Sequence, residues 1–197
     1  MLDLKEFTIP GLSALTLSVE EGECIGLSGI SGCGKTRLLR AIADLDEHEG
    51  ELKLDGINWF DVPANQWRRT VALLPAESLW WFDTIGEHFS DNHEAINHLG
   101  FSLETSKWES SRCSSGEKQR LSILRLLANN PRVLLLDEPT ANLDEVNSLL
   151  VEQLITDYVR QHGAIAIWIS HNQDQLKRIA SRRFNMEDGR LIAKEIP

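Results

Sequence analysis

The sequence is short of the residue types and segments that mark secreted or membrane-spanning proteins. Its 197 residues include three cysteines, an odd number spread along the chain, so a disulfide framework is not indicated. The longest apolar runs, such as Ala164–Ile169, have the length of a buried strand and fall far short of the roughly 20 residues of a membrane-spanning helix. The first residues, MLDLKE, have neither the basic segment nor the apolar core of a signal peptide. We therefore expect a cytosolic protein.

Positive charge is also scarce. Lys and Arg together number 20, whereas Asp and Glu number 30, which leaves a formal net charge of −10. A protein that binds nucleic acid needs basic surface to neutralise phosphates, so this balance argues against nucleic acid as a partner. Internal repeats and low-complexity linkers are missing too, and the length suits one α/β domain better than two.

Hydrophobic patterning predicts two groups of strands separated by a long stretch with helical periodicity. That stretch runs over residues 83–130 with breaks at Gly100 and around 110–116, and a closing hairpin is expected at 183–193. Strands are predicted at 2–8, 15–19, 24–28, 51–54, 71–74, 133–136 and 164–169, and further helices at 37–43, 145–161 and 172–180. Strands, then helices, then strands again indicate a helical insertion within an α/β sheet.

A phosphate-binding motif follows the strand at 24–28. Residues 29–36 read GISGCGKT and match G-x-x-x-x-G-K-[ST], with a strand before and a helix after. In this motif backbone amides surround phosphate oxygens, the lysine reaches the β- and γ-phosphates, and the hydroxyl binds Mg²⁺. The candidate nucleotide-binding residues are Gly29, Ile30, Ser31, Gly32, Cys33, Gly34, Lys35 and Thr36. The alternative is a glycine-rich turn between strand and helix with no ligand.

Two further strands end in residues that can carry chemistry. The apolar run at 133–136 ends in Asp137 and Glu138, at the sheet edge where ligands bind open α/β sheets. Asp137 is expected to hold Mg²⁺ through water, and Glu138 to orient or deprotonate an attacking water. His171 follows the strand at 164–169, which we expect beside the Asp137 strand, so it would lie near the γ-phosphate. The alternatives are a charged strand end and a surface or capping histidine.

The stretch ESSRCSSGEKQR at 109–120 begins a predicted helix. Ser114 and Glu117 have the spacing of a capping box, in which each side chain bonds the other residue's amide. Capping explains these two residues but not Cys113, Ser115 and Gly116 in the same turn. Bare amides at a helix N-terminus suit an anion.

Together these four stretches resemble the ATP-binding cassette (ABC) ATPases, and the resemblance covers nearly the whole chain. It implies an α/β fold: a P-loop NTPase (RecA-like) core with an N-terminal antiparallel β subdomain and an inserted α-helical subdomain. Residues 1–197 would form a single ABC ATPase domain, with a catalytic core of about 1–75 and 129–197 and a helical subdomain of about 76–128.

The resemblance also implies roles for the site residues. Glu138, His171 and Lys35 would be catalytic, with ATP and Mg²⁺ as cofactors. Residues 109–120 correspond to the signature motif, so Ser114, Ser115 and Gly116 would bind the γ-phosphate of ATP held by a second copy in a head-to-tail homodimer. Ala141–Asp144 correspond to the D-loop, which adds Asp144 to the nucleotide site. The protein would be cytoplasmic and peripheral on the inner face of the cell membrane, attached to a membrane permease.

Three positions depart from the family pattern. Ser115 stands where the signature has the first of two glycines, and Ala76 stands where the Q-loop has its glutamine. Either water or the adjacent Glu77 would then complete the metal site. No convincing aromatic residue stands where the family stacks adenine; Phe7 is the nearest candidate, and the alternative is that it belongs to the core.

One group of aromatic residues and one pair of cysteines bear on the partners of this protein. Trp80, Trp81 and Phe82 lie just past the Q-loop, where the family has a groove that receives a cytoplasmic helix of the permease; they would otherwise be core of the insertion. In the head-to-tail dimer, Cys33 of one copy would face Cys113 of the other and be open to oxidative cross-linking. The alternative is that the two cysteines are unrelated small buried residues.

The function implied is the ATP-binding and ATP-hydrolysing subunit that powers an ABC transporter with a separate permease. Within the family, residues 134–160 are most similar to small bacterial subunits of the metal (iron) exporter type. One alternative is a soluble ABC ATPase acting on DNA or ribosomes, but the coiled-coil insertion, second cassette or basic extensions usual there are missing. Another is an unrelated P-loop kinase, which would make the signature stretch, Asp144 and His171 coincidences.

Overall fold

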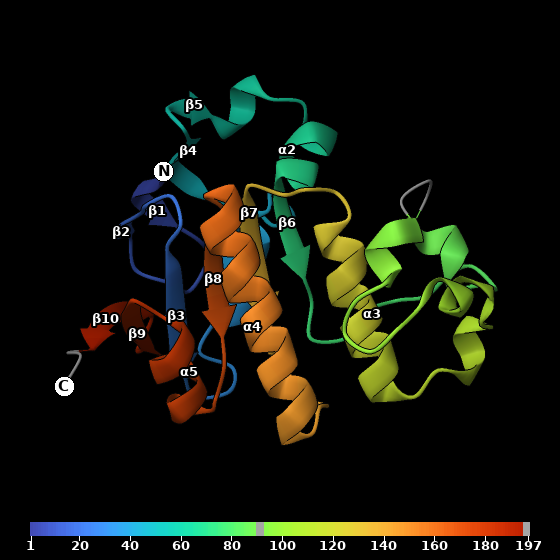
Figure 1. The fold of residues 1–197 in the computed structure, drawn as a ribbon. Coiled ribbons are helices and arrows are strands. Elements are labelled where there is room, and N and C mark those ends of the chain that lie inside the picture. The colour runs from blue at the N-terminus through green and yellow to red at the C-terminus, as the bar shows by residue number, and fades with distance from the viewer. Residues whose placement is uncertain (90–92, 195–197) are drawn as a thin grey trace.

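Two β-sheets form the frame of the molecule in the computed structural model, which describes residues 1–89 and 93–194 (Figure 1). An antiparallel sheet has the order β2-β1-β4-β5, and a six-stranded sheet has the order β10-β9-β3-β8-β7-β6, parallel except for the β9–β10 hairpin. The strands are β1 Leu2–Thr8, β2 Leu15–Val19, β3 Cys24–Gly29, β4 Glu49–Leu54, β5 Ile57–Asn58, β6 Val71–Leu74, β7 Val133–Asp137, β8 Ile165–Ile169, β9 Arg182–Glu187 and β10 Arg190–Lys194.

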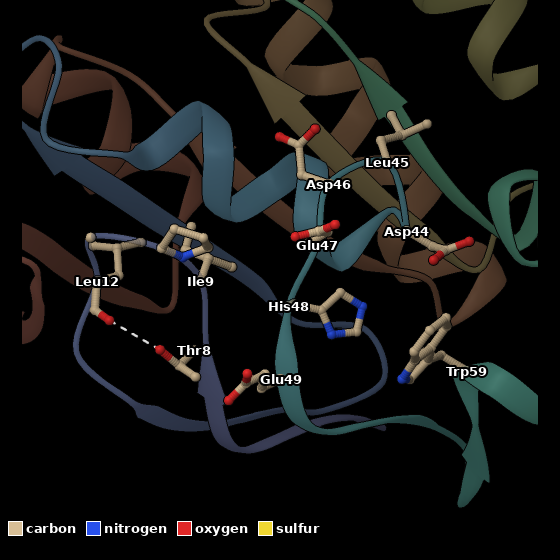
Figure 2. Close-up of a pocket in the computed structure, with 12 residues that line it drawn as sticks. Thr8, Ile9, Leu12, Asp44, Leu45, Asp46, Glu47, His48, Glu49 and Trp59 are labelled. Carbon is tan, nitrogen blue, oxygen red and sulfur yellow. Dashed lines mark hydrogen bonds between the residues drawn. The ribbon is translucent and has the colours of Figure 1, made fainter.

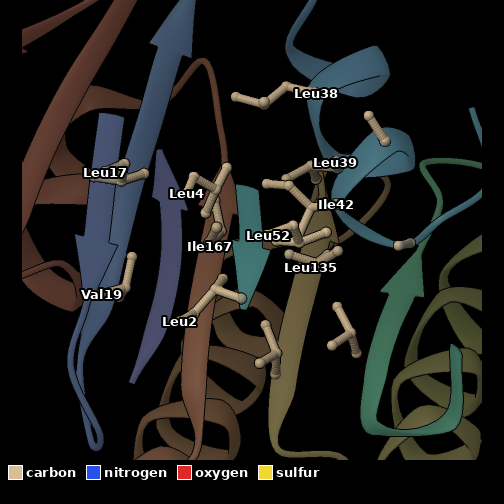
Figure 3. Close-up of a cluster of buried hydrophobic side chains, with 14 of the residues drawn as sticks. Leu2, Leu4, Leu17, Val19, Leu38, Leu39, Ile42, Leu52, Leu135 and Ile167 are labelled. Atoms are coloured by element: carbon tan, nitrogen blue, oxygen red, sulfur yellow. The ribbon is translucent and has the colours of Figure 1, made fainter. Parts of the chain in front are cut away.

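Helices cover both faces of the parallel sheet. The α-helices are α1 Lys35–Ile42, α2 Ala64–Thr70, α3 Ser115–Leu127, α4 Glu145–His162 and α5 Gln173–Ile179. In Figure 1, α4 and α5 lie together on one face of this sheet. Helix α1 packs on the opposite face, in a core shared with the antiparallel sheet, where Leu39 and Ile42 lie near Leu4 and Leu52 (Figure 3). Within residues 1–89 and 93–194, no helix combines the length and apolar character needed to cross a bilayer.

The apolar run in β7 is a consequence of this layering. Val133 and Leu135 belong to the core around α1, whereas Leu134 and Leu136 belong to the core under α4 and α5. Successive side chains of a strand point to opposite faces, so a strand covered on both sides must be apolar at every position. Asp137, which ends this strand, is the first residue free to be polar.

The insertion confirms the expected break in the sheet but is only partly α-helical. Of the stretch expected to show helical periodicity, α3 is the long helix. The rest is made of 3₁₀ turns around a small core of its own; residues 90–92 lie outside the described part of the chain. These turns are Gly86–Phe89, His93–Ile96, Leu103–Lys107 and Ser110–Arg112. Short segments interrupted by Gly100 cannot repay helix nucleation, so single turns form instead.

The sequence patterns did not predict one segment, which lies between β4 and β6 along the chain. It comprises β5, a 3₁₀ turn at Trp59–Asp61, and α2. Helix α2 has only 7 residues, begins after Pro63 without a side-chain cap, and buries Trp67 alone. A two-turn helix of this kind has too little periodicity to be recognised from sequence.

Candidate nucleotide-binding site

The loop between β3 and α1 has a backbone that requires glycine. Gly29 and Gly34 have φ values of 150° and 108°, in the region that residues with a side chain rarely adopt. A Cβ atom on Gly29 would also lie 2.5 Å from the carbonyl oxygen of Met186. The predicted phosphate-binding motif therefore forms a tight turn directly ahead of α1, as the pattern indicates.

Lys35, the first residue of α1, turns back over this loop. Its Nζ donates to the carbonyl oxygens of Gly29 at 2.9 Å and Ile30 at 3.0 Å, and lies 3.8 Å from Cys33 Sγ. The side chain is buried, yet within the described part of the chain it forms no ion pair. A buried ammonium held only by neutral carbonyls is well suited to an incoming anion.

Thr36 and Asp137 meet although they are far apart in the sequence. Thr36 Oγ1 donates to Asp137 Oδ2 at 2.8 Å, and the carboxylate is buried at the end of β7. A hydroxyl and a carboxylate side by side are oxygen donors of the kind that Mg²⁺ prefers. The donor set fits the expected metal.

Glu138 and His171 are paired at the ends of β7 and β8. Glu138 Oε1 lies 3.5 Å from His171 Nε2, and this oxygen is buried and has no hydrogen-bond partner among residues 1–89 and 93–194. Burial raises the pKa of Glu138 above its ordinary value of 4.5, while the nearby His171 works in the opposite direction. Glu138 also has a left-handed backbone, with φ of 49°. Strain of this kind persists only where the surrounding structure enforces it.

Comparison with known proteins identifies this arrangement. The model of the family described as "ABC transporter" matches residues 12–141. The chain belongs to the ABC transporter family. It is an ATP-binding, ATP-hydrolysing subunit of the kind that powers such transporters.

The ABC relatives are similar over most of this chain. The aliphatic sulfonates import ATP-binding protein SsuB of Pseudomonas entomophila (strain L48) is 33% identical over 188 residues, which span 90% of this chain and 68% of the relative. SsuB of Pseudomonas putida is 32% identical over 190 residues, 91% of this chain and 68% of the relative. These relatives carry importer names, and neither supports the resemblance to metal exporters.

Solved ABC structures share the fold. The ATP-binding cassette MJ0796, in a dimeric post-hydrolysis state with ADP and Pi, matches with a TM-score of 0.87 and 22% identity over 100% of this chain and 99% of that chain. A bacterial Atm1-family ABC exporter with ATP bound matches with a TM-score of 0.84 and 23% identity over 96% of this chain and 38% of that chain. The predicted P-loop core with its two additions is therefore confirmed.

The predicted signature stretch leads into α3 and forms the predicted capping box. Ser114 N donates to Glu117 Oε2 at 2.8 Å, and Glu117 N donates to Ser114 Oγ at 3.3 Å, which completes the capping box. Ser114 and Ser115 are exposed. Gly116 lies against the D-loop, because a Cβ atom there would lie 3.3 Å from the carbonyl oxygen of Asn142.

The predicted D-loop and the predicted signature lie against each other. Gln119 Nε2 donates to the carbonyl oxygen of Pro139 at 3.1 Å, just ahead of the D-loop. Asp144 is exposed and caps α4, accepting from Asn147 N at 2.8 Å. Helix α3 packs beside β6, and two strands separate β6 from β3. One chain therefore holds the signature apart from its own phosphate loop (Figure 1).

Glu77 does not approach the metal donors by any contact. Its side chain is exposed. Across residues 1–89 and 93–194, no hydrogen bond or ion pair joins Glu77 to Thr36 or Asp137. The role of Glu77 as a metal ligand stays a prediction. That Ala76 occupies the position of the Q-loop glutamine also stays a prediction.

Of the two alternatives for Phe7, the structure supports a core residue and not an adenine-stacking one. Phe7 is completely buried, and its ring packs 4.8 Å from the ring of His48. A cavity of about 780 Å³ lies beyond it, between the β1–β2 connection and the segment after α1 (Figure 2). The cavity is lined by Thr8–Leu12, Asp44–Glu49 and Trp59. Leu12 connects it to the phosphate loop, because a Cβ atom on Gly34 would lie 3.4 Å from Leu12 Cδ1.

The structure also weighs against the cross-link between Cys33 and Cys113. Cys113 is buried in the core of the insertion, where Ile85 and Leu121 are its neighbours in the apolar cluster. Burial raises the pKa of this thiol, and Glu117 adds to the effect. A buried thiol with a raised pKa is a poor source of the thiolate that disulfide formation needs.

Proposed function

We propose that Lys35, Thr36, Asp137, Glu138 and His171 form one half of an ATP-hydrolysing site. Phosphate oxygens would replace the loop carbonyls around Lys35 Nζ, so that a neutral set of acceptors gives way to a charged one. Thr36 and Asp137 would hold Mg²⁺, which neutralises charge on the phosphates. The backbone amides of Gly29–Gly34 complete the phosphate cradle.

Glu138 acts in this proposal on the attacking water. The observation that carries the assignment is its buried Oε1, which lies next to His171 and has no hydrogen-bond partner in the part of the chain that the structure describes. A carboxylate oxygen that accepts no hydrogen bond can accept a proton from water, and a raised pKa makes that transfer more favourable. His171 orients the carboxylate.

Replacement of this carboxylate by its amide tests the assignment. Glu138→Gln should bind ATP as the wild type does and lose roughly 10²- to 10⁴-fold in turnover, the usual contribution of a general base. Binding is measured by titration with a fluorescent ATP analogue and turnover by phosphate release. Glu94→Gln, at an exposed position in the insertion, is the matched control. Near wild-type turnover in Glu138→Gln rules the role out.

We propose that the second half of the site comes from another copy of this chain. The separation of α3 from β3 supports this arrangement, because one chain alone leaves Ser114 and Ser115 exposed and Gly116 half-buried at a helix N-terminus. In a head-to-tail homodimer these residues meet the γ-phosphate on the partner's phosphate loop, and Asp144 lies at the same interface. Glu138→Gln should then accumulate as a dimer in ATP, which light scattering measures directly.

The nucleoside end of ATP is placed against aliphatic residues in this proposal. The cavity of about 780 Å³ adjoins α1, and a Cβ atom on Gly11 would lie 3.6 Å from Arg37 Nη1. Ile9, Pro10 and Leu12 line the side of this cavity near the phosphate loop. They offer an apolar wall for a base, in a cavity that Trp59 also lines.

The partner outside the dimer is a membrane permease, and we place its contact at Leu79–Phe82. Leu79, Trp81 and Phe82 are 77%, 64% and 45% exposed, although apolar residues of this size are usually buried. Exposed aromatic side chains gathered in one place mark interaction surfaces. The subunit would therefore lie in the cytoplasm against the inner face of the membrane. A Leu79→Ser/Trp81→Ser variant should fold normally and no longer sediment with the membranes of its native cells.

A further inference from the structure

The exposed segment Leu79–Phe82, called here the aromatic loop, is held by internal contacts instead of being free. Ser110 Oγ donates to the carbonyl oxygen of Phe82 at 2.7 Å, and Ser110 N donates to that of Asp83 at 2.8 Å. An apolar surface that is already ordered loses less entropy on binding than a mobile one. The residues that order this loop therefore bear on how well it can bind.

His88 lies at the centre of these contacts. It is 7% exposed, and its ring lies 4.8 Å from that of Trp80, 5.0 Å from that of Trp81 and 5.1 Å from that of Phe82, with all three pairs edge to face or nearly so. One buried ring thus touches every aromatic side chain of the loop.

The hydrogen bonds of His88 require its neutral form. Nε2 lies 3.0 Å from the backbone N of Trp81 and 3.0 Å from that of Phe82, and both of these groups can only donate. Nδ1 lies 2.9 Å from the carbonyl oxygen of Thr84, which can only accept. The proton is therefore on Nδ1 and the lone pair on Nε2. A second proton on Nε2 would point a donor at two donors and abolish both loop contacts.

Arg125 of α3 holds the other side of the loop. Its guanidinium lies 4.5 Å from the ring centre of Trp80 and 4.9 Å from that of Trp81, and Nη1 donates to the carbonyl oxygen of Leu79 at 3.1 Å. The groups that hold this cation, two aromatic faces and a carbonyl, do not titrate in the range of a histidine.

We propose that neutral His88 is the positioning residue of the aromatic loop and that its protonation releases the loop, so that attachment to the permease weakens in acid. The consequence for the permease rests on the function proposed above. The release itself is a property of this chain alone.

The charged and polar groups around His88 set where the release occurs. Burial lowers the pKa of His88 below its ordinary value of 6.5, and the positive charge of Arg125 from α3 works in the same direction. The backbone groups of Thr84 and Ile85 and the carboxylate of Glu87, from its own segment, oppose them. The loop should therefore stay ordered through neutral pH and open only below the range in which an exposed histidine titrates.

Amide hydrogen exchange on the isolated subunit tests the release. After correction for intrinsic exchange, protection of the Trp81 and Phe82 amides should fall roughly tenfold or more as pH is lowered through the His88 titration, because two hydrogen bonds are lost. The ¹⁵N shifts of His88 report its titration in the same sample. Protection that does not change with pH through that titration overturns the proposal, and this measurement needs no variant.

Two variants sharpen the test. His88→Gln keeps an acceptor that cannot titrate, so protection should persist at all pH values; His88→Ala should lose protection at all pH values. His98→Gln, at an exposed histidine of the same insertion, should retain the wild-type response to pH. If His88→Gln still loses protection in acid, another group controls the loop and the proposal fails.

Membrane sedimentation separates this proposal from the proposed permease contact. If exchange depends on His88 as described but Leu79→Ser/Trp81→Ser still sediments with membranes, the release is upheld and the docking assignment is wrong. If that variant is lost from membranes but wild-type exchange is insensitive to His88 protonation, the docking assignment stands and the switch is wrong.

Discussion

Ser114→Ala separates the two roles that the start of α3 can have. In the isolated chain Ser114 Oγ accepts from Glu117 N at 3.3 Å and donates to Glu117 Oε2 at 2.7 Å, as one half of a capping box. The other half, from Ser114 N to Glu117 Oε2 at 2.8 Å, does not involve the hydroxyl and survives the substitution. Both residues are on the surface, so water can replace the lost contacts.

The cost in stability is therefore small. Loss of an N-cap costs about 1 kcal/mol, against a total stability of roughly 5–15 kcal/mol. For a chain of this size that corresponds to a fall of about 2–4 °C in Tm. Helix α3 itself stays anchored, because Leu121 and Leu124 are buried in the core of the insertion.

The cost in turnover is much larger if the hydroxyl also meets the partner's γ-phosphate. A hydrogen bond to a charged group contributes about 1.5–3 kcal/mol, which corresponds to roughly a 10- to 150-fold loss of turnover. Calorimetry gives Tm and phosphate release gives the rate. Ser102→Ala, which removes the hydroxyl half of the capping box of a 3₁₀ turn in the same insertion, should lower Tm without a comparable loss of turnover. Small losses of equal size in both quantities would show that Ser114 is only a cap.

Two further predictions concern the metal site and pH. Glu77→Ala should lower Mg²⁺-dependent hydrolysis more than Ala76→Gln raises it, as measured by phosphate release at varied Mg²⁺; an unchanged rate in Glu77→Ala would assign the ligand position to water. The kcat profile should lose activity on the acid side at a pH above the ordinary 4.5 of a glutamate, because Glu138 must be ionised to act and its pKa is raised. The effect of pH on folding stability has the opposite sign to its effect on activity. A carboxyl whose pKa is higher in the folded state stabilises the fold at low pH, and this contribution disappears as the pH rises through the folded-state pKa. Glu138→Gln should remove this part of the pH dependence of unfolding.

Much of the site could be predicted because its residues are set by local requirements. The GISGCGKT stretch needs glycines at positive φ and places Lys35 and Thr36 at the first positions of α1, whatever the rest of the chain does. The run in β7 is apolar because both faces are covered, so its end at Asp137 is visible in the pattern. The pairing of Ser114 with Glu117 is local in the same way.

Other features depend on contacts between distant segments, and no local pattern encodes them. Phe7 is buried because β1 packs against α1 and because its ring packs on His48. Although Phe7 is an aromatic residue at a suitable place in the sequence, its ring is therefore not available to stack on adenine. The 3₁₀ turns of the insertion form because its short segments gain more from their common apolar core than from extended helix.

His88 is the clearest case. In the sequence it is one histidine among six, without a motif. Only the folded chain brings its Nε2 to the amides of Trp81 and Phe82 and its Nδ1 to the carbonyl oxygen of Thr84. Sequence patterns report residue type and spacing, whereas the protonation state that a buried imidazole must have is decided by the donors and acceptors that tertiary structure places around it.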